Sequence, residues 1–220
     1  PCRDMSIGAA SGHALAGPAL AEFADVSDAI VEAARKFPDR IALEGGDDRL
    51  TYRELMARVA LVSGALRAKG VGPDSVVALC VGRTTALPVA MLAVLEAGAA
   101  YLPLDGSQPP ARLSRILADA APQLIIVDAE RASVVAPLAQ CPVVRLDSLI
   151  ATSPSQPAKR EHGELAYVIH TSGSTGTPVG VEVRRRSLSN FLAAMALELP
   201  ISADDTVLAV TTVSFDIAVL

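Results

Sequence analysis

The chain has 220 residues, of which 51% are hydrophobic and 20% charged, and its formal net charge is -5. These values indicate a globular protein with enough apolar material for one large domain or two small ones. The acidic balance and an aromatic content of 3% without Trp argue against a nucleic-acid surface.

Cysteine and histidine usage indicates neither a disulfide framework nor a metal site. The three cysteines, Cys2, Cys80 and Cys141, are widely spaced, and no pair among the three histidines has metal-ligand spacing. Cys80 lies in an apolar run and is expected to be a small core residue. We therefore predict a reducing compartment, the cytoplasm, and no metal ligands in this stretch.

The first 25 residues are rich in Ala, Gly and Ser and lack the basic-then-apolar layout of a signal peptide, so residues 1–25 are predicted to be a flexible tail or linker. The most apolar long run, residues 86–104, is interrupted by Pro88, Glu96 and Gly98. Those interruptions predict a buried helix and a buried strand, and not a membrane span.

Residues 26–150 alternate helical and β-like patterns and are predicted to form a first α/β lobe. A helix is predicted over 27–37, and a second begins at Thr51, where Glu54 completes a capping box, and ends near Gly70. The apolar stripe of that second helix consists of Leu55, Val59, Val62 and Leu66.

Four near-continuous apolar runs in this lobe are predicted to be strands, and two helical patterns lie among them. The strands are residues 75–82, 99–105, 123–129 and 141–147, and the helices are residues 86–98 and 111–120. Strands of this kind separated by helices are typical of a parallel sheet covered on both faces. The predicted fold class is therefore α/β, a three-layer sandwich with mainly parallel sheets flanked by helices.

A polar, proline-bearing stretch at 151–163 is predicted to be a linker, and 164–220 to begin a second lobe. This lobe is predicted to contain strands at 164–170 and 179–183, a helix carrying Leu188 and Leu192 on one side, and a strand at 206–215. The run Arg184 to Arg186 is expected to be a solvated strand end. The abrupt stop at residue 220 predicts a truncated chain.

The glycine-rich loop between the first two strands of the second lobe is the main candidate site. Small hydroxyl and glycine residues present backbone N–H and hydroxyl groups that suit phosphate oxygens. The loop lacks the spacing of a Walker A motif, and a strand follows it where a helix would be required. Composition alone leaves open whether it binds phosphate or is a solvent-exposed hairpin.

The stretch "LAYVIHTSGSTGTPVGVEV" at 165–183 resembles the signature of adenylate-forming enzymes, and specifically of adenylation domains of nonribosomal peptide synthetases. Further stretches agree in the order of that family: "LTYREL" at 50–55, "VLEAGAAYLPLD" at 94–105, "RLSRILADAAPQLII" at 112–126 and "SFDIAVL" at 214–220. The resemblance covers nearly everything from residue 27 to the end and implies the N-terminal portion of such a domain.

The resemblance implies an activity, cofactors and partners. The family activates an amino acid with ATP and Mg²⁺ as aminoacyl-AMP, releases pyrophosphate, and transfers the acyl group to the phosphopantetheine thiol of a peptidyl carrier protein. Partners implied are the rest of the adenylation domain and neighbouring synthetase domains, with no nucleic acid and no membrane. The residues implied to hold the β- and γ-phosphates of ATP are Thr171, Ser172, Gly173, Ser174, Thr175 and Gly176.

Asp216 matches the family's aspartate that pairs with the substrate's α-ammonium group, and the resemblance favours this role over the alternative of a helix N-cap. Phe215, Ile217 and Leu220 fall in the substrate-binding segment of the family. Because Ile217 and Leu220 are apolar, a small or apolar amino acid is expected, with glycine as a candidate. Both could also be core residues.

Several positions depart from the family pattern. Val179 stands where the family has lysine, Arg185 where a histidine is usual, and His170 where an aromatic residue is common; Gly106 and Gln108 replace the usual proline and tyrosine. Loss of a loop lysine removes one charge-assisted contact to the phosphates, worth about 1–3 kcal/mol. We therefore expect a slower enzyme or one with an altered loop.

The family's catalytic lysine, acidic metal ligand and adenine-binding segment would lie beyond residue 220, so these 220 residues alone are expected to be inactive. One alternative is another adenylate-forming ligase of the acyl-CoA ligase type, in which Asp216 would have no amine to pair with. The other is a degenerate, non-catalytic adenylation-domain fragment, for which Val179 and the early end at residue 220 are the arguments.

Overall fold

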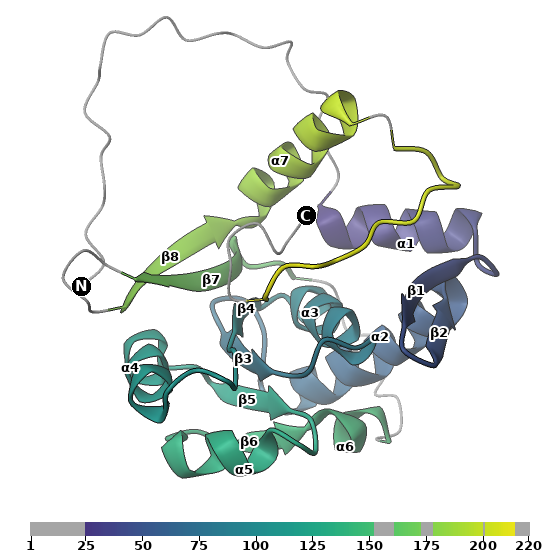
Figure 1. Ribbon diagram of the computed structural model, residues 1–220. Helices are drawn as coiled ribbons and strands as arrows, with labels where there is room; N and C mark the ends of the chain where they lie inside the picture. The colour runs from purple at the N-terminus through teal and green to yellow at the C-terminus, as the bar shows by residue number, and fades with distance from the viewer. Residues whose placement is uncertain (1–24, 152–160, 173–177, 200, 214–220) are drawn as a thin grey trace, which may run out of the picture.

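A mainly parallel sheet forms the centre of the computed structural model, which describes residues 25–151, 161–172, 178–199 and 201–213. The strand order is β6-β5-β3-β4-β7-β8, and only β8 runs antiparallel to its neighbour (Figure 1). Its strands are β3 (Val76–Cys80), β4 (Ala100–Pro103), β5 (Leu124–Val127), β6 (Val143–Arg145), β7 (Leu165–Ser172) and β8 (Pro178–Arg184).

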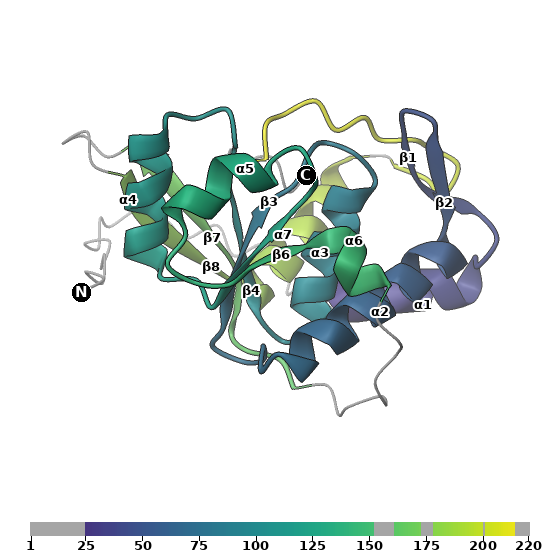
Figure 2. The ribbon, with the colours of Figure 1, turned by 90° about the horizontal axis from the view of Figure 1, so that it is seen from below.

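Helices cover both faces of this sheet, as the near-continuous apolar strands predicted. On one face, α1 (Val26–Lys36), α2 (Tyr52–Ala68), α3 (Ala86–Glu96), α6 (Leu146–Ile150) and α7 (Arg185–Glu198) share a core with Val77 and Leu79 of β3. On the other face, α4 (Pro110–Ala120), α5 (Ala132–Val135) and the 3₁₀ turn η1 (Ala136–Leu138) pack on Ala78 and Cys80. Figure 2 shows the sheet between these layers. The predicted three-layer α/β fold is confirmed.

Local sequence signals placed the ends of α2 correctly. The side chain of Thr51 accepts from the Glu54 N–H, and the Glu54 carboxylate accepts from Thr51 N at 2.8 Å. The helix stops just before Gly70, whose φ of 80° is a left-handed conformation that favours glycine. All four residues of the predicted apolar stripe are buried.

A two-stranded hairpin, β1 (Ile41–Gly45) and β2 (Asp48–Thr51), lies outside the main sheet and was not predicted from the sequence. Gly46 makes its tight turn with a φ of 61°. The hydroxyl of Thr85 donates to Asp48 and ties the hairpin to the start of α3.

The strand predicted at 206–215 is wrong over its described part, residues 206–213, which are irregular. Val207, Leu208 and Val210 are 63%, 81% and 70% exposed. An apolar, β-branched run becomes a strand only where a neighbouring strand completes its hydrogen bonds, and no described strand pairs with this one. The segment is instead tied by Arg83, whose Nη2 donates to the carbonyl oxygen of Ala209 at 2.6 Å.

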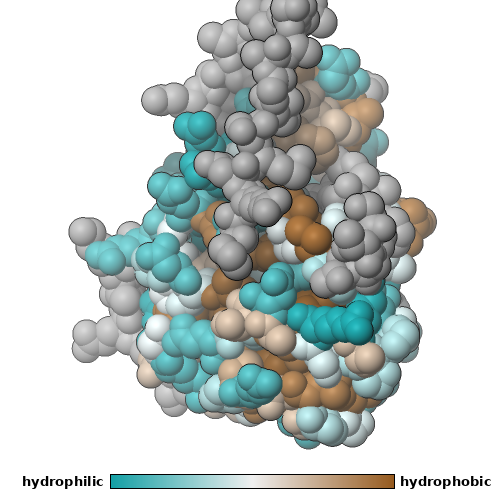
Figure 3. All heavy atoms as spheres, turned by 90° about the vertical axis from the view of Figure 1, so that its left-hand side faces the viewer, coloured by the Kyte–Doolittle hydropathy of each residue, from teal (hydrophilic) through white to brown (hydrophobic). Residues whose placement is uncertain are grey.

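Apolar side chains also reach the surface on the hairpin of β7 and β8. Val179 and Val181 are 53% and 44% exposed. Figure 3 shows brown apolar areas broken by teal polar ones on the face seen from this side of the molecule. Within the described segments, no helix has both the length and the apolarity needed to cross a membrane.

Candidate functional site

The carboxyl ends of the parallel strands are where ligands bind in open α/β sheets, at the point where the strand order reverses. Here the chain passes from β3 to β4 on one side and then returns to β5 on the other side of β3. The reversal therefore lies between β3 and β5, and the residues directly after these strands decide whether a crevice is open there.

A polar cluster of Gly82, Asp128 and Arg131 fills this position. Oδ2 of Asp128 accepts from the N–H of Gly82 at 2.7 Å and from Nη1 of Arg131 at 2.6 Å. Oδ1 accepts from the backbone N–H of Arg131 at 2.9 Å. A Cβ at Gly82 would lie 2.7 Å from Nη1 of Arg131, so a side chain there would displace the guanidinium. The protein's own charges thus occupy the usual ligand position.

The electrostatics of Asp128 fit this structural role. Burial opposes ionisation, but the N–H groups of Gly82 and Arg131 and the Arg131 guanidinium outweigh it and lower the pKa of the carboxyl group. This cluster was missed by the sequence analysis. The available signal was that Gly82 and Asp128 each follow an apolar strand at or near its carboxyl end.

Cys80, at the end of β3, is a buried core residue as predicted, and burial raises the pKa of its thiol to about 11. Burial also raises the pKa of Cys141, which is only half-buried. Because the thiolate is the reactive form, we expect iodoacetamide at pH 8 to label Cys141 well before Cys80 in the folded chain. Peptide mass spectrometry would measure both rates. Equal labelling rates of Cys80 and Cys141 in the folded chain, with faster labelling of both in urea, would contradict the expectation.

The candidate phosphate loop connects β7 and β8 at the same carboxyl edge. The register pairs Thr171 with Val179 and Ser172 with Pro178, so the two strands form the predicted hairpin up to the loop. Thr171 is exposed at the end of β7. Gly173, Ser174, Thr175 and Gly176 lie outside the described residues, as does the side chain of Ser172.

Val179 lies directly opposite Thr171 on the neighbouring strand and is 53% exposed. Directly paired residues project from the same face of a sheet. A longer side chain at position 179 therefore has open space beside Thr171, at the base of the loop.

Arg185 is the second departure from the family pattern, and the expectation of a solvated strand end is wrong for it. Its side chain is 6% exposed, and Nη1 donates to Oδ1 and Oδ2 of Asp25 at 3.0 and 3.1 Å. Its Nη2 donates to the carbonyl oxygen of Leu95. Arg184, by contrast, is exposed as predicted. The first turn of α7 points Arg185 inward, between the ends of α1 and α3, which the sequence pattern did not reveal.

The predicted substrate residues Phe215, Asp216, Ile217 and Leu220 lie outside the described residues, so their placement stays a prediction. Among the described residues, no group of three His, Cys, Asp or Glu side chains could hold a metal ion. Of the residues predicted to bind phosphate, Thr171 is the one whose side-chain exposure the structure describes, and it is exposed at this edge.

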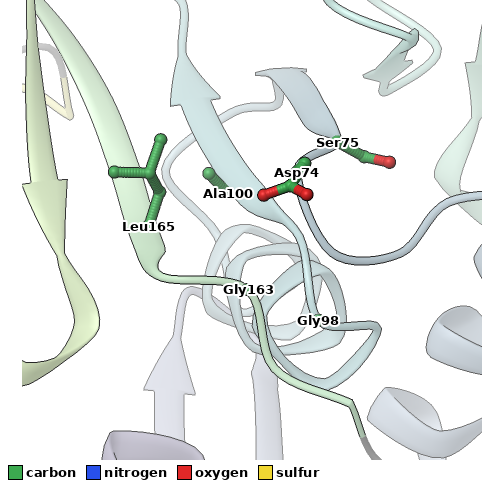
Figure 4. Close-up of a pocket in the computed structure, with 6 residues that line it drawn as sticks. All are labelled: Asp74, Ser75, Gly98, Ala100, Gly163 and Leu165. Atoms are coloured by element: carbon green, nitrogen blue, oxygen red, sulfur yellow. The ribbon is translucent and has the colours of Figure 1, made fainter.

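A small cavity lies at the opposite, amino-terminal edge of the sheet. It has a volume of about 20 Å³ and is lined by Asp74, Ser75, Gly98, Ala100, Gly163 and Leu165, which Figure 4 shows at the starts of β3, β4 and β7. This volume accommodates about one water molecule and no nucleotide. It is therefore a packing feature of the fold.

Comparison with known proteins gives a consistent result. The family model for AMP-binding enzymes matches residues 30–220. A dimodular nonribosomal peptide synthase of Bacillus subtilis (strain 168) is 40% identical over 190 residues, which are 83% of this chain and 8% of that protein. The chain thus spans less than a tenth of that curated relative.

Solved structures agree with the sequence relatives. The nonribosomal peptide synthetase FmoA3 superposes with a TM-score of 0.81 at 28% identity, over 90% of this chain and 21% of that one. A four-domain nonribosomal peptide synthetase bound to AMP and glycine has a TM-score of 0.80 at 31% identity, over 89% of this chain and 14% of that one. FmoA3 has also been solved with AMPPNP bound.

Proposed function

This chain belongs to the family of AMP-binding enzymes, and we propose that it forms the first part of an amino-acid adenylation domain of a nonribosomal peptide synthetase. In the reaction, a carboxylate oxygen of the amino acid attacks the α-phosphorus of ATP. The bond from that phosphorus to the bridging oxygen of the β-phosphate breaks, which gives aminoacyl-AMP and pyrophosphate. The acyl group then passes to the phosphopantetheine thiol of a carrier protein, with release of AMP.

The observation that carries this proposal is the position of the β7–β8 hairpin. It brings the exposed Thr171 to the carboxyl edge of the central sheet, while Asp128 and Arg131 fill the usual crevice between β3 and β5. The phosphates of ATP would therefore bind at the hairpin, to Thr171 and to Ser172, Gly173, Ser174, Thr175 and Gly176. An amino-acid carboxylate is already nucleophilic, so the work of the protein is positioning and charge stabilisation.

The remaining components of the reaction follow from the family. Mg²⁺ would be held by residues outside the described part of the chain and would supply positive charge to the phosphates. Asp216 would pair with the substrate ammonium group, and Phe215, Ile217 and Leu220 would line a pocket for a small or apolar side chain. The partners would be the rest of the adenylation domain, a carrier protein and neighbouring synthetase domains, in the cytoplasm.

Amino-acid-dependent ATP–pyrophosphate exchange tests the proposal. The assay would use the complete natural polypeptide that includes these 220 residues, offered each common amino acid in turn. We expect exchange with one or a few small or apolar amino acids. Exchange that depends on a carboxylic acid without an amine, and with no amino acid, would favour the acyl-CoA ligase alternative.

Val179→Lys is expected to accelerate this exchange about tenfold at low ATP concentration, because it adds one charge-assisted contact to the phosphates. The exposed position of Val179 opposite Thr171 leaves room for the longer side chain. Val181→Lys, a similarly exposed position on the same strand, is the matched control and is expected to change the rate little. Equal changes in exchange rate for the two substitutions would contradict the proposal that residue 179 contacts the phosphates.

A further inference from the structure

The end of the β7–β8 hairpin has little support from the rest of the sheet. The register between β4 and β7 pairs Tyr101 with Tyr167, whereas β7 continues to Ser172. On its other side, β7 pairs only with β8, which has no further strand neighbour among the described residues. The carboxyl half of the hairpin, which leads into the predicted phosphate loop, therefore needs some other contact to hold its position.

A side-chain pair between β7 and helix α4 supplies this contact. Nε2 of His170 lies 2.9 Å from Oδ2 of Asp119, and the His170 side chain is 2% exposed. A carboxylate oxygen accepts hydrogen bonds, so this contact corresponds to the tautomer in which Nε2 is the donor. The other ring nitrogen, Nδ1, is buried and has no partner among the described residues. The ring is thus held by Asp119 and not by solvent.

Gly180 makes the pair possible. It lies directly opposite His170 in the hairpin register. A Cβ at this position would lie 3.2 Å from Nε2 of His170 and 3.3 Å from Oδ2 of Asp119. Both distances are tighter than ordinary van der Waals contact, so any side chain would press on the two polar atoms that form the bond. The absence of a side chain lets α4 approach the hairpin closely.

We infer that His170 and Asp119 are positioning residues that anchor the phosphate-loop hairpin to α4 across Gly180. This inference rests on the proposed function. His170 immediately precedes Thr171, so a shift of its ring moves the first residue proposed to contact the phosphates. The pair itself touches no substrate. Its loss is therefore expected to weaken ATP binding and to leave the chemical step largely intact, because the hairpin is proposed to contact the β- and γ-phosphates and not the α-phosphorus, which the carboxylate attacks.

The test is a double-mutant cycle in the ATP–pyrophosphate exchange assay on the complete natural polypeptide. Asp119→Asn is expected to raise the KM for ATP about fivefold, with kcat changed less than about twofold. In a His170→Phe background, Asp119→Asn is expected to have no further effect, since its partner is gone. Gly180→Ala is expected to raise KM in the same way as Asp119→Asn.

Glu182→Gln is the matched control. It removes the same charge from an exposed position of β8, where Glu182 makes no hydrogen bond or ion pair that the described part of the chain reveals. A KM change equal to that of Asp119→Asn would show a general charge effect and overturn the inference. So would additive effects of Asp119→Asn and His170→Phe.

Failure of the proposed function can be distinguished from failure of this inference. If the unsubstituted polypeptide shows no exchange with any substrate, backbone hydrogen exchange measured by mass spectrometry decides the inference alone. Faster amide exchange at 168–172 and 178–181 in Asp119→Asn than in Glu182→Gln would support the anchor. Equal exchange in the two variants would overturn it.

Discussion

Arg185→Ala is expected to destabilise the fold by about 3–5 kcal/mol, because it removes a buried guanidinium and leaves the partly buried Asp25 carboxylate without its charged partner. The side chains of Arg185 and Asp25 are 6% and 17% exposed. The substitution also leaves the carbonyl oxygen of Leu95 without the guanidinium that donates to it. Urea denaturation of the 220-residue chain, followed by circular dichroism, would measure the loss.

Arg184→Ala is the matched control for this prediction. Nη1 of Arg184 lies 3.6 Å from Glu164, with side chains 61% and 80% exposed, and exposed pairs of this kind contribute at most about 1 kcal/mol. Asp25→Ala is expected to be nearly as harmful as Arg185→Ala, and the double variant to be less harmful than the sum. Additive losses would mean that the two side chains do not act as a pair.

The same ion pair predicts a dependence of stability on pH. Burial opposes ionisation of Asp25, but the Ser27 N–H and the Arg185 guanidinium outweigh it and hold the pKa below the ordinary value of 3.8. The unfolded chain therefore takes up a proton at higher pH than the folded chain does. The contribution of the pair to stability is present above about pH 3.8 and is lost as pH falls through the folded-state pKa. Urea denaturation between pH 3 and pH 6 is expected to show a smaller acid effect in Arg185→Ala.

Gly98→Ala is expected to cost about 3 kcal/mol or more, for two separate reasons. Gly98 has a φ of 92°, a conformation that residues with a Cβ rarely adopt. A Cβ there would also lie 2.1 Å from the carbonyl oxygen of Glu161, which is backbone and has little freedom to move away. The N–H of Gly163 donates to the carbonyl oxygen of Gly98 at 3.0 Å, so the clash would disturb this connection as well.

Gly46→Ala separates the two reasons. Gly46 also has a positive φ, 61°, but no atom lies within 4 Å of its would-be Cβ. Its substitution should cost only the conformational term, about 1–2 kcal/mol. The difference in free energy of unfolding between the two variants measures the clash. Equal losses in free energy of unfolding would show that the backbone near Glu161 moves away from the added Cβ at no measurable energetic cost.

The motif "VLEAGAAYLPLD" illustrates what pattern and structure each contribute. The sequence analysis used it to identify the family. The structure explains why position 98 is a glycine. Gly98 ends α3 in a left-handed conformation and lets residues 161–163 approach the start of β4. Gly180 in the loop motif likewise has a packing reason, the close approach of α4. Such reasons depend on residues distant in sequence, so they are invisible in the motif itself.

Periodicity and end signals were sufficient for α1 to α4, for β3 to β6 and for the hairpin that carries the loop, but not for β1, β2, α5, η1 and α6. They were sufficient because hydrophobic alternation, capping boxes and glycine stops act over a few neighbouring residues. They failed at residues 206–213, whose sequence has a strand pattern but whose backbone is irregular and whose apolar side chains are exposed. Strand formation depends on a partner strand, which the local sequence does not specify.

The sequence by itself determined the family, the α/β class and the segment proposed to bind ATP, because these follow from short contiguous motifs and from the spacing of apolar residues. Only the tertiary structure decided which polar residues work together. Arg185 meets Asp25, 160 positions away, Asp128 closes the crevice beside Gly82, and His170 meets Asp119 across Gly180. Burial and pairing of charge arise where distant elements pack, and no local pattern encodes which elements will meet.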